Sequence, residues 1–294
     1  MGIAIVARSF QAGTGPGGKP FNQETFENLV AKPIERILQS EAIQKLIVAV
    51  NAEPGNKLSE IPDDPISEGG MTPTMLALKA RFPKEMKTSK IIILPCTNWG
   101  PNPGSAIALN MGLEIASQES DWVLNWSPEM EMDSRRIELG LAHAERHHLP
   151  IVGFLRQNWW ERPQWAVPQN TACLWKADLL SRVNGFASEC NGTGRIIKIA
   201  LRPGEEPEDI PVAGMEDFHT LLRMQKKFED LRWGMAGRSE PLSWNTDFQG
   251  ERLATHLKKV ARQYQVMQIW AKDIFPELSF NQVMNQLFAR CHID

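Results

Sequence analysis

Two groups of acidic residues have the types and spacing that could do chemistry. Residues 129–133 hold acids at alternate positions, directly after an apolar run. Glu216 and Asp217 form an adjacent pair where a helical pattern begins. Carboxylates can hold a divalent cation or accept a proton from a hydroxyl group. The alternatives are solvated loop acids for the first group and, for the second, acids that favour the positive end of a helix.

Residues 91–133 predict the elements that position the first group. An apolar run at residues 91–94 is followed by a loop rich in Gly, Asn and Pro, a helical pattern, and a second apolar run at residues 122–126. This order is typical of a βαβ unit in a parallel sheet, where ligands sit beyond the carboxyl ends of the strands. We therefore expect the acids after Trp126 and the later acid pair to converge on one cleft at that rim.

The rest of the chain reads as a large α/β domain followed by a helical appendage. Asn22 is a predicted N-cap for a helix that Pro33 should kink or divide. From Gly250 onward the pattern is helical, which predicts the C-terminal appendage. The apolar patterns predict further strands at residues 3–7, 46–50, 151–155, 171–175 and 196–201, and helices at residues 24–39, 73–80, 135–147, 176–183 and 215–229.

Composition limits the class of protein. The chain has 294 residues and a formal net charge of −3, so no overall field recruits nucleic acid or an anionic membrane. The four cysteines share no close spacing, which argues against a zinc site or a disulfide framework and favours a cytoplasmic location. No run approaches the roughly 20 apolar residues of a transmembrane helix. Residues 2–7 are better interpreted as a buried first strand than as a signal peptide.

Four segments, in this order, resemble family-2-like glycosyltransferases of the GT-A fold. They are the loop and helix at residues 98–112, the strand and acids at residues 122–133, the strand and helix at residues 170–186, and the acid pair with its helix at residues 214–223. The resemblance implies an α/β fold with a GT-A-like (Rossmann-like), mostly parallel central sheet flanked by helices. It places the glycosyltransferase domain at residues 1–235 and the C-terminal helical extension at residues 236–294.

The resemblance also implies an activity, the transfer of a sugar from a nucleotide-diphosphate donor to a hydroxyl acceptor. Asp217, with Glu216 beside it, falls at the family's catalytic acid pair, where a carboxylate takes the proton of the acceptor hydroxyl. The predicted donor-binding residues are Arg8, Asn51, Asn98, Gly104, Asn110, Ser127 and Glu129.

The metal motif departs from the family pattern. Where the family has Asp-x-Asp, this chain reads Ser127-Pro128-Glu129. A Mg²⁺ or Mn²⁺ cofactor held by Glu129 and His219 is one alternative, but a serine hydroxyl is a far poorer metal ligand than a carboxylate. The departure leaves a second hypothesis open, in which a catalytically weakened GT-A domain binds nucleotide or sugar, or acts as a scaffold.

A loop rich in Trp and Arg is the predicted acceptor site. The chain holds ten tryptophans against one tyrosine, and tryptophan faces suit ring-shaped apolar surfaces such as sugar rings, although core packing is their ordinary role. Arg156 precedes this loop and suits an anionic acceptor or a donor phosphate. The predicted acceptor-binding residues are Trp159, Trp160, Trp165 and Arg162.

Overall fold

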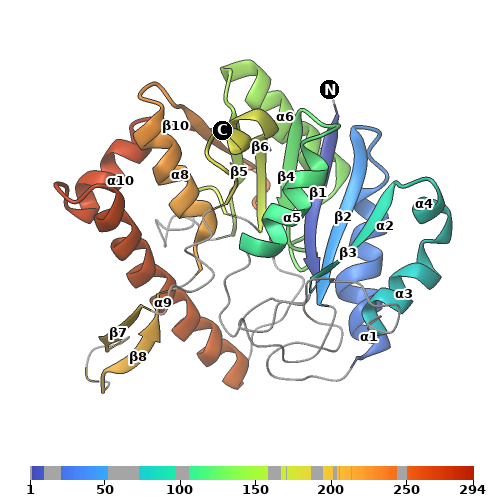
Figure 1. The fold of residues 1–294 in the computed structure, drawn as a ribbon, viewed down its shortest axis with the longest axis horizontal. Coiled ribbons are helices and arrows are strands. Elements are labelled where there is room, and N and C mark those ends of the chain that lie inside the picture. Colours follow the sequence, from blue (N-terminus) through green and yellow to red (C-terminus); the bar gives the residue numbers. More distant parts are fainter. Residues whose placement is uncertain are drawn as a thin grey trace.

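Figure 1 shows the computed structural model of the chain, whose centre is one large sheet between helices. The structure describes residues 2–9, 21–51, 73–96, 106–157, 167–169, 171–186, 195–200, 204, 206–212, 214–243 and 250–294. The sheet has eight strands in the order β10-β9-β5-β6-β4-β1-β2-β3. Within it, β6 runs antiparallel to both of its neighbours and the other neighbouring pairs are parallel. The predicted α/β fold with a mostly parallel sheet is therefore confirmed.

The strands of the large sheet are short and mostly buried. Their bounds are β1 (Ile3–Ser9), β2 (Ile43–Asn51), β3 (Ile91–Cys96), β4 (Trp122–Trp126), β5 (Ile151–Phe154), β6 (Ala172–Lys176), β9 (Trp233–Ala236) and β10 (Cys291–Ile293). A separate two-stranded antiparallel sheet consists of β7 (Ile196–Ile199) and β8 (Glu208–Pro211). The parallel strands β1, β2 and β4 end at one rim, at the bottom of Figure 1.

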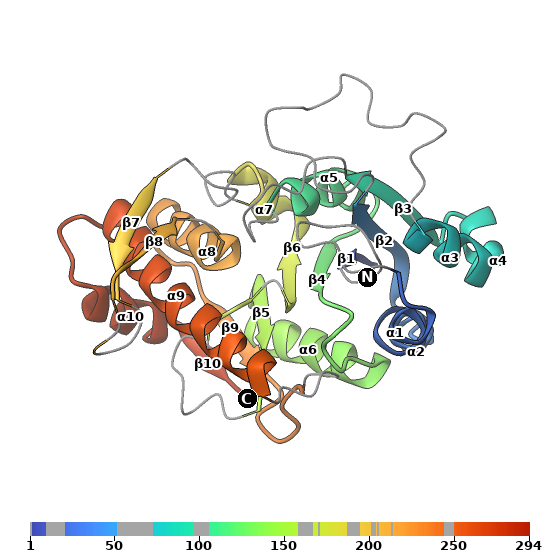
Figure 2. The ribbon, with the colours of Figure 1, turned by 90° about the horizontal axis from the view of Figure 1, so that it is seen from below.

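Helices cover both faces of the large sheet, as Figure 2 shows from below. One layer contains α1 (Gln23–Phe26), the π-helix η1 (Glu27–Ala31), α2 (Lys32–Ile37), α3 (Pro73–Arg81), α4 (Pro83–Lys87) and α6 (Ser134–His147). The other contains α5 (Ala106–Ala116), α7 (Ala177–Arg182) and α8 (Glu216–Lys227), followed by α9 (Gly250–Ile274) and α10 (Phe280–Phe288).

Strand β1 shows how the alternation of side chains divides the core. Ile3 and Ile5 belong to the buried cluster beneath α1, α2 and α6. Ala4 and Val6 belong to the cluster beneath α5, α7 and α8. Successive side chains of a strand point to opposite faces, so Arg8 continues the series of Ala4 and Val6. Its side chain is thereby directed to the face that α8 covers.

The first helical segment is divided as Pro33 predicts. The Asn22 side chain accepts a hydrogen bond from the backbone N–H of Thr25 at 2.8 Å, which confirms it as the N-cap. The helix changes to π-type hydrogen bonding in η1 and returns to α-type at α2, where Pro33 lies in the first turn. Proline has no N–H to donate to the preceding turn, and the π-helix η1, whose turns are wider, lies directly before α2.

The C-terminal segment is helical as predicted, with α9 and α10, and adds a strand that the sequence does not predict. Val266 and Trp270 of α9 belong to the same buried cluster as Leu221 of α8 and Trp233 of β9. Strand β10 then pairs with β9 at the edge of the sheet. No helix in the described part of the chain combines the length and apolar character that crossing a bilayer requires. The division of the chain at residue 235 stays a prediction.

A histidine at the C-terminal strand predicts a pH dependence of stability. His143 of α6 is buried, with Nε2 3.2 Å from the backbone oxygen of His292 and Nδ1 3.8 Å from an Asp294 carboxylate oxygen. Burial lowers the pKa of His143 below 6.5. The hydrogen bond to the His292 carbonyl and the charge of Asp294 oppose this shift, and His147 and Arg146 add to it. Below about pH 6.5, His143 therefore binds a proton more readily in the unfolded chain than in the folded chain.

We expect the free energy of unfolding to fall as the pH is lowered from 7.5 to 5.5, and to fall less in His143→Gln. Urea unfolding at both pH values measures this. The matched control is His148→Gln, since His148 is exposed on the following turn. A His143→Gln variant with the same pH dependence as the unchanged chain would contradict the assignment.

Candidate functional site

At the predicted rim, an ion pair joins the end of β1 to the start of α8. Ala7 pairs with Trp126 in the parallel β1–β4 ladder, so Arg8 and Ser127 follow side by side at the carboxyl ends of these strands. Arg8 Nη1 lies 3.5 Å from a Glu216 carboxylate oxygen, and the two side chains are 18% and 2% exposed. The end of β1, the segment after β4 and the start of α8 therefore meet at one rim.

The chain enters α8 through a turn that buries both acids. Gly214 and Met215 have positive φ values of 84° and 59°, and the left-handed conformation is unfavourable for Met215 because of its Cβ atom. The Gly214 carbonyl accepts a hydrogen bond from Trp270 Nε1 at 3.0 Å, which fixes this turn against α9. Glu216 and Asp217, in the first turn of α8, are each 2% exposed. Such strain persists where the surrounding structure enforces it, as at functional sites.

A second arginine lies in the electrostatic field of Asp217. Arg156, just after β5, is buried and donates a hydrogen bond to the hydroxyl of Thr171. Burial lowers the pKa of Arg156 to about 10, and Asp217 opposes that shift. Burial also lowers the pKa of Arg8, while Glu216 and Asp217 oppose it. Since a pKa of about 10 is well above neutrality, Arg156 carries its charge at pH 7.

Cys173 forms part of the apolar floor beneath these charges. It is fully buried in β6. Burial, together with the charge of Asp217, raises the pKa of the Cys173 thiol well above its usual value. The thiolate is the nucleophilic form of cysteine, so this residue has no nucleophilic role at neutral pH.

Asn125 is a polar residue of the site floor that the sequence pattern does not single out. It is 0% exposed, and neither atom of its amide has a hydrogen-bond partner among the described residues. In the sheet it pairs with Val6 on one side and Cys173 on the other. Its side chain therefore lies on the Arg8 face, one pleat below the rim. Its signal in the sequence is a single amide inside an apolar strand.

Replacing Asn125 by Val tests whether this amide serves the site. Removing a buried polar group that has no partner among the described residues should stabilise the fold by about 1–3 kcal/mol, and Val suits a central strand. We expect a higher free energy of unfolding together with lower activity, as for other residues that trade stability for function. Urea unfolding and turnover of the nucleotide-sugar donor that the sequence predicts measure the two effects. A variant that is destabilised, or stabilised with full activity, would contradict the assignment.

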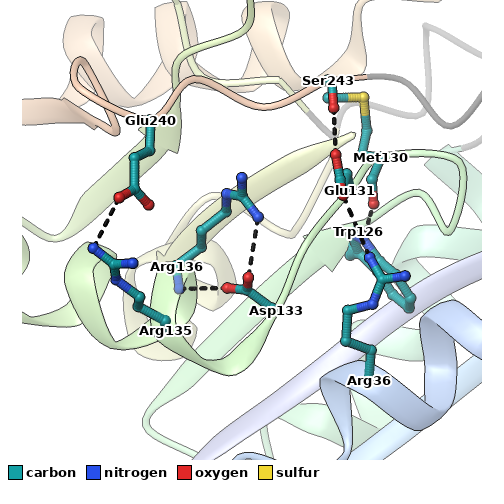
Figure 3. Close-up of polar contacts among 9 residues, drawn as sticks. All are labelled: Arg36, Trp126, Met130, Glu131, Asp133, Arg135, Arg136, Glu240 and Ser243. Atoms are coloured by element: carbon teal, nitrogen blue, oxygen red, sulfur yellow. Dashed lines mark hydrogen bonds and ion pairs between the residues drawn. The ribbon is translucent and has the colours of Figure 1, made fainter.

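The acids that follow Glu129 have structural partners, shown in Figure 3. Glu131 accepts a hydrogen bond from the Ser243 hydroxyl at 2.5 Å and lies 3.6 Å from Arg36. Asp133 caps α6 by accepting from the backbone N–H of Arg136 at 2.8 Å. These contacts direct both side chains to the α6 side of the loop.

Ser127 and Glu129 lie in the turn that links β4 to those acids. The Ser127 N–H donates to the Thr171 carbonyl at 2.9 Å, and the Ser127 carbonyl accepts from the Met130 N–H at 2.8 Å. Glu129 lies inside this turn and is partly exposed. The turn thus holds the motif Ser127-Pro128-Glu129 next to β6 and beside Arg8.

Two further predicted site residues have clear surroundings. Asn110 of α5 exchanges two hydrogen bonds with the Phe186 backbone, at 2.8 and 2.7 Å. That arrangement joins α5 to the turn after α7. His219 is buried, and its ring contacts Trp270 edge to face with centroids 4.8 Å apart. Residues that are two positions apart on a helix point in directions about 200° apart. The His219 side chain therefore leaves α8 on a different side from the Asp217 side chain.

The remaining predicted residues cannot be placed beside these. Strand β2 ends at Asn51, of which the structure describes the backbone. Outside the described residues lie Asn98, Gly104, Trp159, Trp160, Arg162 and Trp165. In the part that is described, no group of three His, Cys, Asp or Glu side chains is arranged to hold a metal ion.

Comparison with solved structures finds chains of similar fold, a mannosyltransferase among them. The mannosyltransferase PcManGT from Pyrobaculum calidifontis, solved with GDP-Man and Mn²⁺, matches with a TM-score of 0.55 and 12% identity, over 98% of this chain and 73% of that chain. The 1–349 portion of TarS from S. aureus matches with a TM-score of 0.55 and 12% identity, over 99% and 71% of the two chains. The same portion of TarS solved with UDP-GlcNAc matches with a TM-score of 0.53 and 12% identity, over 99% and 72%.

In sequence, no protein-family model and no curated protein matches. At 12% identity the structural likeness establishes the fold and not the activity. The match nevertheless extends over nearly the whole chain and includes the sheet that carries the Arg8 rim. This chain therefore has the GT-A fold, as the four sequence segments predict.

Proposed function

We propose that this protein is a glycosyltransferase that moves a sugar from a nucleotide-diphosphate donor to a hydroxyl acceptor. The observation that carries the proposal is the buried pair Glu216 and Asp217, which opens α8 against Arg8 and beside the segment that follows β4. In α/β sheets this carboxyl rim is where ligands bind. An acid pair, two arginines and a polar turn at that position suit a donor with a charged diphosphate.

In the proposed reaction Asp217 is the general base. An acceptor hydroxyl attacks the anomeric carbon of the donor sugar, and the Asp217 carboxylate takes its proton. The donor side of the site comprises Arg8, Ser127 and Glu129, together with the predicted residues Asn51, Asn98, Gly104 and Asn110. The acceptor side is the loop that carries Trp159, Trp160, Arg162 and Trp165. The protein acts in the cytoplasm, in keeping with its widely spaced cysteines.

The proposal is supported by what the structural relatives hold. PcManGT was solved with GDP-Man and Mn²⁺, and TarS with UDP-GlcNAc, so uridine and guanosine donors are the first to test. For this chain a metal held by Glu129 and His219 is a weak part of the proposal. Ser127 stands at the first metal position, and His219 leaves α8 on a different side from Asp217.

A panel of nucleotide sugars tests the function. Binding of UDP- and GDP-sugars is measured by calorimetry, and release of the nucleoside diphosphate is followed with and without a mixture of sugar acceptors. We expect one donor to bind and to be slowly hydrolysed, with faster release when an acceptor is present. Absence of binding across the panel, with a folded protein confirmed by circular dichroism, would overturn the proposal.

The second candidate is a catalytically weakened GT-A domain that binds a nucleotide or sugar, or acts as a scaffold. Ser127 in the metal motif favours it, because the family's carboxylate is missing at that position. This candidate predicts donor binding without hydrolysis or transfer in the same panel. The two functions are therefore separated by turnover and not by affinity.

A further inference from the structure

The side chains at the rim fit a divalent metal poorly. A metal of this kind prefers several carboxylate oxygens. At this rim the first motif position is a serine, and the Glu216 carboxylate already faces a guanidinium at 3.5 Å. Glu131 and Asp133 are engaged with Ser243 and with the start of α6. Glu129 and Asp217 are the other carboxylates there, yet among the described residues no three His, Cys, Asp or Glu side chains are placed to hold one metal ion, so the rim fits Mg²⁺ or Mn²⁺ poorly.

The same rim carries two fixed cations. Arg8 extends from the end of β1 beside Ser127, and Arg156 extends from the end of β5 to Thr171. The Thr171 carbonyl in turn accepts from the Ser127 N–H. The two guanidinium groups therefore approach the Ser127 segment from its two sides. Together with the buried acids Glu216 and Asp217 they form a cluster in which two positive charges face two negative charges, while Glu129 in the turn beside Arg8 is partly exposed.

From this arrangement we infer that Arg8 and Arg156 bind the donor diphosphate in the place of a metal ion. The inference rests on the proposed function and assigns to it a metal-independent mechanism. Two guanidinium groups placed among the carboxylates oppose the binding of a divalent cation there, whereas arginine pairs with phosphate through two parallel N–H···O bonds. Both arginines are largely withdrawn from water, where their attraction for a phosphate is screened least.

In the reaction the bond between the anomeric carbon and the diphosphate oxygen breaks, and its electron pair stays on that oxygen. A bond forms from the acceptor oxygen to the anomeric carbon, and the acceptor proton goes to Asp217. The charge that develops on the leaving diphosphate is stabilised by Arg8 and Arg156, which are already in place before the reaction. Glu216 is then a positioning residue, since its carboxylate holds the Arg8 guanidinium.

Calorimetry with UDP and GDP, in EDTA or in MnCl₂, tests the inference on the full chain. We expect the nucleotide that binds to do so equally well in both buffers. Arg8→Gln and Arg156→Gln should each weaken its binding by about tenfold or more, because each removes a charged hydrogen-bond partner. The affinity for the matching nucleoside, uridine or guanosine, should stay the same. The matched control is Arg135→Gln, which removes an exposed arginine paired with Glu240.

The outcomes separate this inference from the proposed function. If neither UDP nor GDP binds in either buffer, the proposed function fails. If binding requires MnCl₂, or if Arg8→Gln binds the diphosphate as tightly as the unchanged chain, the function stands and the inference is overturned. Thermal melting monitors folding. Should Arg8→Gln not fold, Arg8→Lys is used, and it should bind the diphosphate more weakly because an ammonium group lacks the planar fork.

Discussion

Turnover by Asp217→Asn is expected to fall by about 10²–10⁴-fold, while the donor still binds. The amide is close to the carboxylate in size but cannot take the proton of an acceptor hydroxyl. Asp217 is buried in the first turn of α8, where the fields of Arg8 and Arg156 reach it. Steady-state transfer kinetics and calorimetry with the donor measure the two quantities on the same preparation.

Stability has to be followed in the same experiment. Asp217→Asn removes one of the two negative charges that face Arg8 and Arg156, so some loss of unfolding free energy is expected along with the loss of turnover. The control is Asp230→Asn, an exposed acid after α8. Unchanged kcat in a folded Asp217→Asn variant would show that another group is the base.

Trp126→Ala is expected to lower the free energy of unfolding by about 3–5 kcal/mol. Trp126 is 1% exposed at the end of β4 and lies in the core beneath α1, α2 and α6. Its Nε1 donates to the Met130 carbonyl at 3.2 Å, so the ring also supports the turn that holds Ser127 (Figure 3). Urea unfolding followed by circular dichroism measures the change.

Trp126→Phe separates the two contributions. The smaller ring keeps most of the buried apolar area but cannot donate to Met130. We expect about 1–2 kcal/mol of destabilisation from the lost hydrogen bond and the reduced volume. Equal free energies of unfolding for Trp126→Ala and Trp126→Phe would contradict the expected contribution of the buried apolar area, because Phe keeps most of that area and Ala does not.

The sequence predicts the central elements well because their patterns are local. The apolar run 122–126 coincides with β4, and the helical pattern from Gly250 onward contains α9 and α10. The two short strands at the β10 end of the sheet are different. Strand β10 has three residues and pairs with β9, which contains Gly234. Neither strand is long enough to show an alternation of apolar and polar residues. Their pairing also depends on α9 and α10, which lie between them in the sequence.

The candidate site shows the same division between local and distant information. Parallel topology predicts that the segment after β4 lies at a rim, and a family resemblance singles out Asp217. The ion pair between Arg8 and Glu216 joins residues 208 positions apart, and no local pattern predicts that contact. Asn110 illustrates the reverse case, because its motif suggests a donor contact, whereas its amide is hydrogen-bonded to the Phe186 backbone. Its donor-binding role stays a prediction.

The distance in sequence between Arg8 and Glu216 has a consequence for biosynthesis. The first strand leaves the ribosome long before α8, and domains generally fold as units during translation. Contacts between remote segments also form late because closing a long loop costs entropy. A nascent chain that ends before residue 216 would carry Arg8 without its carboxylate partner. The rim is therefore among the last parts of the molecule to mature, and no truncated product that lacks α8 can carry the complete proposed site.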